Sequence, residues 1–330
     1  MAPIIPRATR VGRMSLNHGH ISTFANEAFE RLARDTTTDY IPTGLDDLDW
    51  ITRGLPRGSL TVLCGNSASH KDIFASNIVE HLALPNTGDS SKGHAPQHAL
   101  VCLTGTSSRH HALSLMCRLA GVKICKVKTG FPDETTRTKL EAARNRLATA
   151  SIHLCELRGG DVTTLRDHAS GLHSKLRGEG KSLSLITIDN LQLLHITAPE
   201  ERPAKDQKTA VLLALKALAE ELNTAVLGLC CPTRKGICSG SERMDNFLRK
   251  NDLEWNQAIE STADLVMHLQ RVPEADVIAP DGGHTRRFEL AITNNRNGPI
   301  GGVDLRLNHK MHVPQCFISD ENALPRPKPV

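Results

Sequence analysis

Residues 59–73 read SLTVLCGNSASHKDI, an apolar run that breaks at Gly65 into a polar loop and then leads through Lys71 into a predicted helix. This layout matches the phosphate-binding pattern G-x-x-x-x-G-K-[ST]. In that pattern glycines let backbone N–H groups face phosphate oxygens, lysine neutralises charge, and a hydroxyl holds Mg²⁺. Gly65 and Lys71 fit, whereas His70 stands at the second glycine and Asp72 at the hydroxyl. The residues expected to surround a nucleotide are Gly65, Asn66, Ser67, Ala68, Ser69, His70, Lys71 and Asp72.

The two replacements predict weakened nucleotide binding. A residue with a Cβ is penalised where the chain needs a positive φ, which affects His70. A carboxylate at Asp72, beside Lys71, repels a triphosphate. One alternative is that Asp72 itself ligates Mg²⁺, since carboxylate oxygen suits that ion. A plainer alternative is an ordinary strand, turn and helix with Lys71 in solvent.

The preceding residues 41–65 read IPTGLDDLDWITRGLPRGSLTVLCG and resemble the DnaB-type replicative helicases, which are RecA-like ATPases. The resemblance implies an α/β fold of the RecA-like P-loop NTPase class. That fold has a mainly parallel central sheet with helices on both faces and a C-terminal β-hairpin. It also implies ATP and Mg²⁺ as ligands. The positions that carry the resemblance are Thr43, Gly44, Leu45, Asp46, Leu48, Asp49, Gly54, Leu55 and Gly58.

Strand-like and helix-like segments alternate along the rest of the chain, which predicts a parallel sheet with helices on both faces. We expect strands at 99–104, 151–155, 183–188 and 225–230, and helices near 108–120, 133–148, 161–177 and 205–222. Four segments are expected: a disordered basic arm at 1–20, a linker helix at 21–40, the RecA-like domain at 41–312, and a flexible proline-rich tail at 313–330. In the resembling family a helix at the linker position docks on a neighbouring ring subunit. The alternative is that it packs on its own domain.

Composition narrows the class of protein. The chain has 39% apolar and 23% charged residues, and we expect no membrane segment. The net charge of +4 permits a nucleic-acid partner without indicating one. Nine cysteines without a C-x-x-C pair favour reduced thiols and a cytoplasmic location. The histidines within 109–111 lack obvious metal partners and are interpreted as surface residues.

The catalytic positions implied by the resemblance are partly replaced. Asp189 ends a predicted strand and matches the acid that holds Mg²⁺, with Asp72 as a possible second ligand. Gly105 stands where the family has the glutamate that activates water, so the expected base is lost. Cys231 stands at the glutamine that senses the γ-phosphate. Arg296 matches the arginine finger that acts in trans on a neighbour's site.

A polar segment at 233–251 corresponds to loops that hold single-stranded DNA in the resembling rings. Neutralisation of DNA phosphates is the physical basis of such contacts. A solvated basic loop is the alternative, and Glu254 reverses the charge of a phosphate-contacting arginine of the family. The candidate DNA-binding residues are Arg234, Lys235, Arg243, Arg249 and Lys250.

Three functional hypotheses follow. The first is a DnaB-like protein of DNA replication with weak or lost ATP hydrolysis, acting as a binding or assembly partner of its own copies or of a DnaB-type helicase. The second is an active ATP-dependent replicative DNA helicase with a nucleotide site rebuilt around Asp72. The third is a non-enzymatic ring that binds single-stranded DNA.

Overall fold

The computed structural model describes residues 20–32, 39–84, 97–130, 133–197, 204–231, 253–272, 277–278, 284–310 and 313–319. The chain divides into two units, 1–39 and 40–330. In the first unit, α1 (Ile21–Leu32) is a helix that lies within the segment expected to form the linker helix. The predicted arm before residue 20 lies outside the described residues. Within the described ranges, no helix is both long and apolar enough to cross a membrane.

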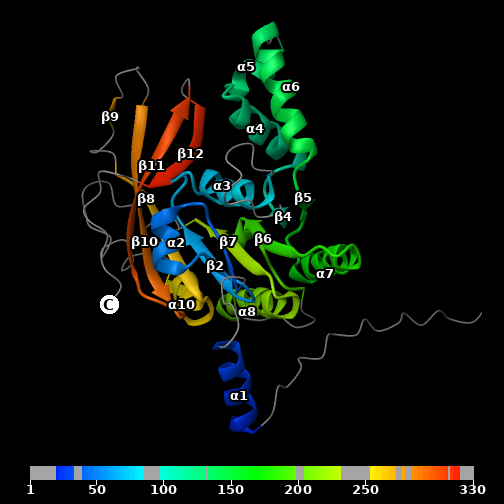
Figure 1. Cartoon of the computed structure of the whole chain (residues 1–330), viewed down its shortest axis with the longest axis vertical. Coiled ribbons are helices and arrows are strands. Elements are labelled where there is room, and N and C mark those ends of the chain that lie inside the picture. The colour runs from blue at the N-terminus through cyan, green and yellow to red at the C-terminus, as the bar shows by residue number, and fades with distance from the viewer. Residues whose placement is uncertain are drawn as a thin grey trace, which may run out of the picture. The chain divides into compact units, whose positions relative to one another are not determined.

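The second unit is built on one mixed sheet with the strand order β12-β11-β10-β8-β3-β7-β6-β4-β5 (Figure 1). The strands from β8 to β5 in this order are parallel, whereas β10, β11 and β12 are antiparallel. The predicted mainly parallel sheet with a C-terminal hairpin is therefore confirmed. The strands are β3 (Leu60–Cys64), β4 (His98–Leu103), β5 (Ile152–Glu156), β6 (Leu183–Asp189), β7 (Ala225–Cys230), β8 (Leu265–Arg271), β10 (His284–Asn295), β11 (Gly301–Lys310) and β12 (Val313–Ser319). Short β9 (Val277–Ile278) pairs with β10, and β1 (Tyr40–Ile41) pairs with β2 (Leu55–Pro56).

Helices cover both faces of the sheet, as the α/β pattern predicts. A hydrophobic core lies on each face of the sheet, and successive residues of β3 point into one or the other. Leu63 packs on one face with Phe74 of α3, and Val62 packs on the other face with Leu215 of α8. The helices are α2 (Asp46–Thr52), α3 (Lys71–Ala83), α4 (Ser108–Ala120), α5 (Ile124–Lys128), α6 (Glu134–Ala148), α7 (Val162–Gly178), α8 (Ala204–Leu222) and α10 (Leu253–Thr262), with a 3-10 turn η3 (Leu191–Leu193).

The residues that carry the resemblance form the turns that precede β3. The Asp49 carboxylate accepts hydrogen bonds from the Thr43 N–H at 3.0 Å, the Thr43 hydroxyl at 2.7 Å and the Gly44 N–H at 3.2 Å. Gly54 has a φ of 107°, and a Cβ there would lie 2.4 Å from the Ile41 carbonyl oxygen. These residues are therefore needed for the turn that delivers the chain to the sheet.

The C-terminal region differs from the expected tail. Residues Val313–Ser319 form β12, which pairs with β11 from Leu305↔Ser319 to Lys310↔Val313. Strand formation here follows from β-favouring residues such as Phe317 and Ile318 beside an otherwise unpaired edge. The boundary expected at 313 therefore does not separate folded chain from tail. Residues 320–330 lie outside the described part.

Candidate functional site: an altered phosphate loop

The loop between β3 and α3 folds tightly on itself. The Gly65 N–H donates to the Cys230 carbonyl at 3.1 Å, and a Cβ on Gly65 would lie 2.4 Å from the Ser69 hydroxyl oxygen. The Asn66 carbonyl accepts from the Ser69 N–H at 3.1 Å and the Ser69 hydroxyl at 2.8 Å. The Asn66 side-chain oxygen accepts from the Ala68 N–H at 3.0 Å. Glycine at position 65 is thus required by this close approach.

His70 adopts the left-handed conformation that the second glycine of the pattern provides, with φ 54° and ψ 34°. Its ring packs edge-on against Phe288 of β10 at a centroid distance of 6.0 Å. Arg286 donates to His70 Nε2 at 3.1 Å. Burial lowers the pKa of His70, and Arg286 adds to the lowering while Asp72 opposes it. A neutral ring can accept this bond, so contacts with β10 hold the loop in a glycine-like shape.

Two carboxylates meet at the same edge of the sheet. Asp72 lies in the first turn of α3 and Asp189 ends β6. Burial raises the pKa of Asp189, the charge of Asp72 raises it further, and Lys71 opposes the rise. Both carboxylates line a hollow of about 500 Å³ between α3 and α4, together with Ser76, Thr106, His110 and His111.

This donor set fits Mg²⁺ only with further ligands. Within the described ranges, no group of three or more His, Cys, Asp or Glu side chains could hold a metal ion. Mg²⁺ in phosphate-transfer sites is commonly held by one or two carboxylates with substrate phosphates and water. Asp72 and Asp189 could therefore hold Mg²⁺ together with a bound polyphosphate.

The end of β4 supports the site without supplying a base. The Thr104 hydroxyl donates to the Asp189 carbonyl at 2.8 Å and accepts from the Asn190 N–H at 2.7 Å. Gly105 follows and is exposed. On the neighbouring strand β5, the Glu156 carboxylate accepts from the Ser108 N–H at 2.8 Å, at the start of α4. That hydrogen bond is the main cause of the lowered pKa of Glu156. The Glu156 carboxylate therefore caps the N-terminus of α4.

Cys231, which stands where the family has the sensor glutamine, is hydrogen-bonded to Gln192. Cys231 donates its N–H to Gln192 Oε1 at 3.0 Å, and Gln192 Nε2 donates to the Cys231 carbonyl. Within the described residues, neither Cys230 nor Cys231 forms a disulfide. The backbone after β7 is therefore fixed by an amide from η3.

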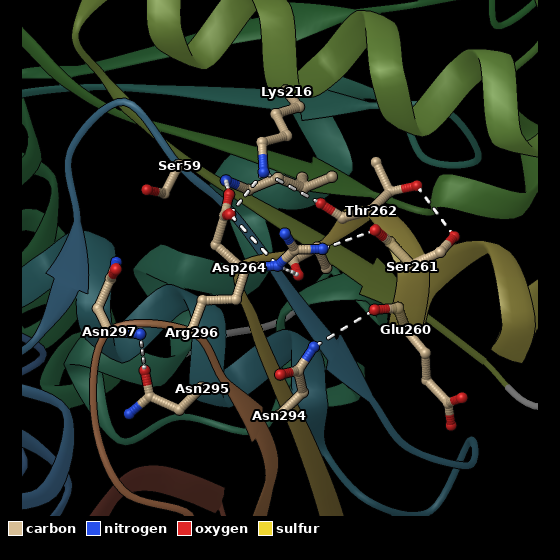
Figure 2. A network of polar contacts seen from close by, with 12 residues as sticks. Ser59, Lys216, Glu260, Ser261, Thr262, Asp264, Asn294, Asn295, Arg296 and Asn297 are labelled. Carbon is tan, nitrogen blue, oxygen red and sulfur yellow. Dashed lines mark hydrogen bonds and ion pairs between the residues drawn. The ribbon is translucent and has the colours of Figure 1, made fainter. Parts of the chain in front are cut away.

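Arg296 lies at the opposite edge of the sheet, in the turn after β10. Figure 2 shows its guanidinium directed at the end of α10, where Nε donates to the Ala263 carbonyl at 3.1 Å and Nη2 to the Ser261 carbonyl at 2.6 Å. Asn294 Nδ2 donates to the Glu260 carbonyl at 3.4 Å. These donors satisfy carbonyls that a helix end leaves unpaired.

Asp264 connects this helix end to the sheet (Figure 2). Its carboxylate accepts from the Leu60 N–H at 3.1 Å and from Lys216 Nζ at 2.6 Å, and it lies 3.8 Å from Arg296 Nε. The Arg296 side chain is 45% exposed. In this arrangement Arg296 serves its own chain, and part of it still faces solvent.

The family model described as "DnaB-like helicase C terminal domain" matches residues 40–313. The chain belongs to this family. The replicative DNA helicase DnaB of Geobacillus stearothermophilus is 26% identical over 272 residues, covering 82% of this chain and 55% of that protein. Replicative DNA helicase DnaC of Bacillus subtilis is 25% identical over 265 residues, covering 80% and 54%. The chain thus spans about half the length of these curated relatives.

Solved structures share the fold of this DnaB-like domain. One of them, an ATPase domain, has a TM-score of 0.71 at 20% identity and covers 92% of this chain and 100% of that one. A DnaB-like replicative helicase, described with its interactions with primase, has a TM-score of 0.68 at 20% identity and covers 92% and 68%. The DnaB-like domain therefore has the RecA-like ATPase fold.

The structure brings together part of the set predicted for a DnaB-like domain. The loop from Gly65 to Asp72, Asp189 and Gly105 lie at the carboxyl edge of the parallel strands, whereas Arg296 lies at the amino edge. The predicted DNA-binding residues Arg234, Lys235, Arg243, Arg249 and Lys250 lie outside the described residues, as does the side chain of Glu254.

Two neighbours of the site were not predicted. His111 was interpreted as a surface residue, but it is half-buried and lines the hollow with Asp72. Burial lowers the pKa of His111. Its four-residue spacing from Leu115, which lines the same hollow, was a usable signal. Arg286 was missed because no local pattern links it to His70.

Proposed function

We propose that this chain is a DnaB-like protein of DNA replication that binds partners and hydrolyses ATP weakly or not at all. The observation that carries this proposal is Gly105. The site keeps two acidic residues and a lysine, but the strand end beside Asp189 offers no carboxylate to activate water. Loss of a general base typically costs about a hundredfold to ten-thousandfold in rate.

Retained binding of ATP with Mg²⁺ is part of the proposal. His70 keeps the left-handed turn, so the helix start can still present N–H groups to phosphate. Lys71 supplies positive charge, and Asp72 with Asp189 could hold the metal ion. The negative charge of Asp72 counts against affinity, so we expect binding weaker than that of a loop with a hydroxyl at this position.

The proposed partners are further copies of the chain in a ring, a DnaB-type helicase, or single-stranded DNA, with a cytoplasmic location. Two features support protein partners. Helix α1 exposes Ile21 and Phe29, each to 73%. The turn carrying Arg296 also exposes Ile300, to 67%. An arginine supplied to a neighbour's site serves there even when its own chain hydrolyses poorly. Such a role requires the Arg296 guanidinium to leave some of its contacts with α10.

The test combines calorimetry of Mg-ATP binding with ATP turnover on the same sample, with and without single-stranded DNA. We expect the wild type to bind Mg-ATP and Lys71→Ala to bind it more weakly. ATP turnover by the wild type should be no greater than turnover by Lys71→Ala. Lys139→Ala, which changes an exposed lysine on α6, is the matched control and should behave like the wild type. Turnover that single-stranded DNA stimulates and Lys71→Ala abolishes would refute the proposal.

That same result would favour an active helicase rebuilt around Asp72. One observation supports this second candidate: Asp72 and Asp189 line one hollow and are close enough for the charge of one to raise the pKa of the other. If Asp72 holds the catalytic metal ion, Asp72→Asn should lower turnover at fixed Mg²⁺. If turnover is absent in the wild type, Asp72→Ser should instead strengthen Mg-ATP binding by removing the repelling charge.

A further inference from the structure

Cys102 and Cys155 form a thiol pair that the nucleotide site does not use. Cys102 lies in β4 and Cys155 in β5, the last strand of the sheet, and the two residues are direct register partners. Register partners on neighbouring strands point to the same face, with Cα atoms about 4.8 Å apart. This separation falls within the range of roughly 4.4–6.8 Å found across disulfides.

The pair is asymmetric in its access to solvent. Cys102 is fully buried in the core beneath α7, among residues that include Leu165 and Ala169. Cys155 packs against the same core but is only half-buried. A small reagent can therefore reach Cys155 first.

The two sulfur atoms are also in direct contact. The thiol of Cys102 donates a hydrogen bond to the sulfur of Cys155, which lowers the pKa of Cys155. Burial opposes this change, and the charge of His168 on α7 adds to it. The same hydrogen bond raises the pKa of Cys102. The thiolate is the form of cysteine that reacts with oxidants, and Cys155 is the sulfur of the pair that a reagent can reach.

We propose that Cys155 and Cys102 are a reversible oxidation site for hydroperoxides, in which Cys155 is attacked first and Cys102 closes a disulfide between β4 and β5. In the first step the Cys155 thiolate attacks the peroxide oxygen, the O–O bond breaks, and Cys155 sulfenic acid and an alkoxide or hydroxide form. In the second step the Cys102 thiol attacks the Cys155 sulfur, the S–O bond breaks, and water leaves. The two electrons lost by the thiols reduce the hydroperoxide.

The test treats the full chain with hydrogen peroxide, blocks remaining thiols with N-ethylmaleimide and maps the peptides by mass spectrometry. We expect a peptide linked through residues 102 and 155 that dithiothreitol separates. In Cys102→Ser the disulfide cannot close, so dimedone should trap a sulfenic acid on Cys155. In Cys155→Ser, Cys102 should remain a thiol.

Cys125→Ser is the matched control because Cys125 is exposed and lies outside the pair. This variant should form the same linked peptide at the wild-type rate. The proposal is wrong if peroxide oxidises Cys125 in the folded wild type and leaves residues 102 and 155 unlinked, or if dimedone labels no Cys155 in the Cys102 variant. Circular dichroism checks that each variant is folded, and Cys102→Ala replaces Cys102→Ser if the hydroxyl prevents folding.

Discussion

Substitution of His70 by glycine and by alanine separates the backbone cost of this position from the contacts of its side chain. Both variants lose the hydrogen bond from Arg286, worth about 1 kcal/mol, and the edge-on contact with Phe288, worth about another 1 kcal/mol. Alanine keeps the penalty of a left-handed backbone, about 1 kcal/mol, and glycine does not. We therefore expect the free energy of unfolding to fall by about 1 kcal/mol in His70→Gly and by about 2 kcal/mol in His70→Ala.

Urea denaturation followed by far-ultraviolet circular dichroism measures these differences from the midpoints, provided that the slope with urea is unchanged. Ser67 supplies the control. It is exposed in the same loop and is absent from the residues with positive φ, so Ser67→Ala should be no less stable than Ser67→Gly. The reasoning is refuted if His70→Ala is as stable as His70→Gly, or if either variant is more stable than the wild type.

Three other changes have defined outcomes. Arg296→Ala removes two hydrogen bonds to the end of α10 and should lower the free energy of unfolding by about 1–2 kcal/mol in urea titrations. If Arg296→Lys is as stable as the wild type, this account is contradicted. Gly54→Ala should prevent stable folding, since the φ of Gly54 is 107° and the new Cβ would lie 2.4 Å from the Ile41 carbonyl oxygen. Gly171→Ala is the control in helix α7. A Cβ there meets nothing within 4 Å, so this variant should raise the thermal midpoint of unfolding. Burial lowers the pKa of His268 to about 4, so the unfolded chain binds a proton near pH 6.5 that the folded chain does not. Stability should therefore fall as pH decreases from about 6.5 towards 4, and urea titrations of His268→Gln across this range should show a shallower fall.

Local patterns were sufficient to predict most of the fold. The apolar run before Gly65 became β3, and the predicted strand at 183–188 became β6, with Asp189 as its last residue. The helix expected at 205–222 is α8, Ala204–Leu222. These predictions succeeded because strand and helix periodicity are properties of short segments. The order of the strands in the sheet was not predicted, because no one segment of the sequence specifies it.

The interactions that local patterns did not predict join residues that lie far apart in the sequence. His70 and Arg286 are separated by 216 residues, and their contact offsets part of the cost of a non-glycine residue in the left-handed turn. Arg296 was predicted from its match to the arginine finger of the resembling family, and nothing local indicated that its donors would satisfy carbonyls of α10. Contacts of this kind depend on how strands pair and where helices end, which single-sequence patterns do not specify.

The position of Arg296 has a consequence for symmetry. The phosphate loop follows β3 and the Arg296 turn follows antiparallel β10, so the two lie at opposite edges of the same sheet. A contact that places the turn of one copy against the loop of a second leaves the first copy with a free loop and the second with a free turn. Such an interface is heterologous and must propagate in one direction. It ends only when the rotation between copies closes a ring, and a mutation that alters this rotation would convert a ring into an open helical filament.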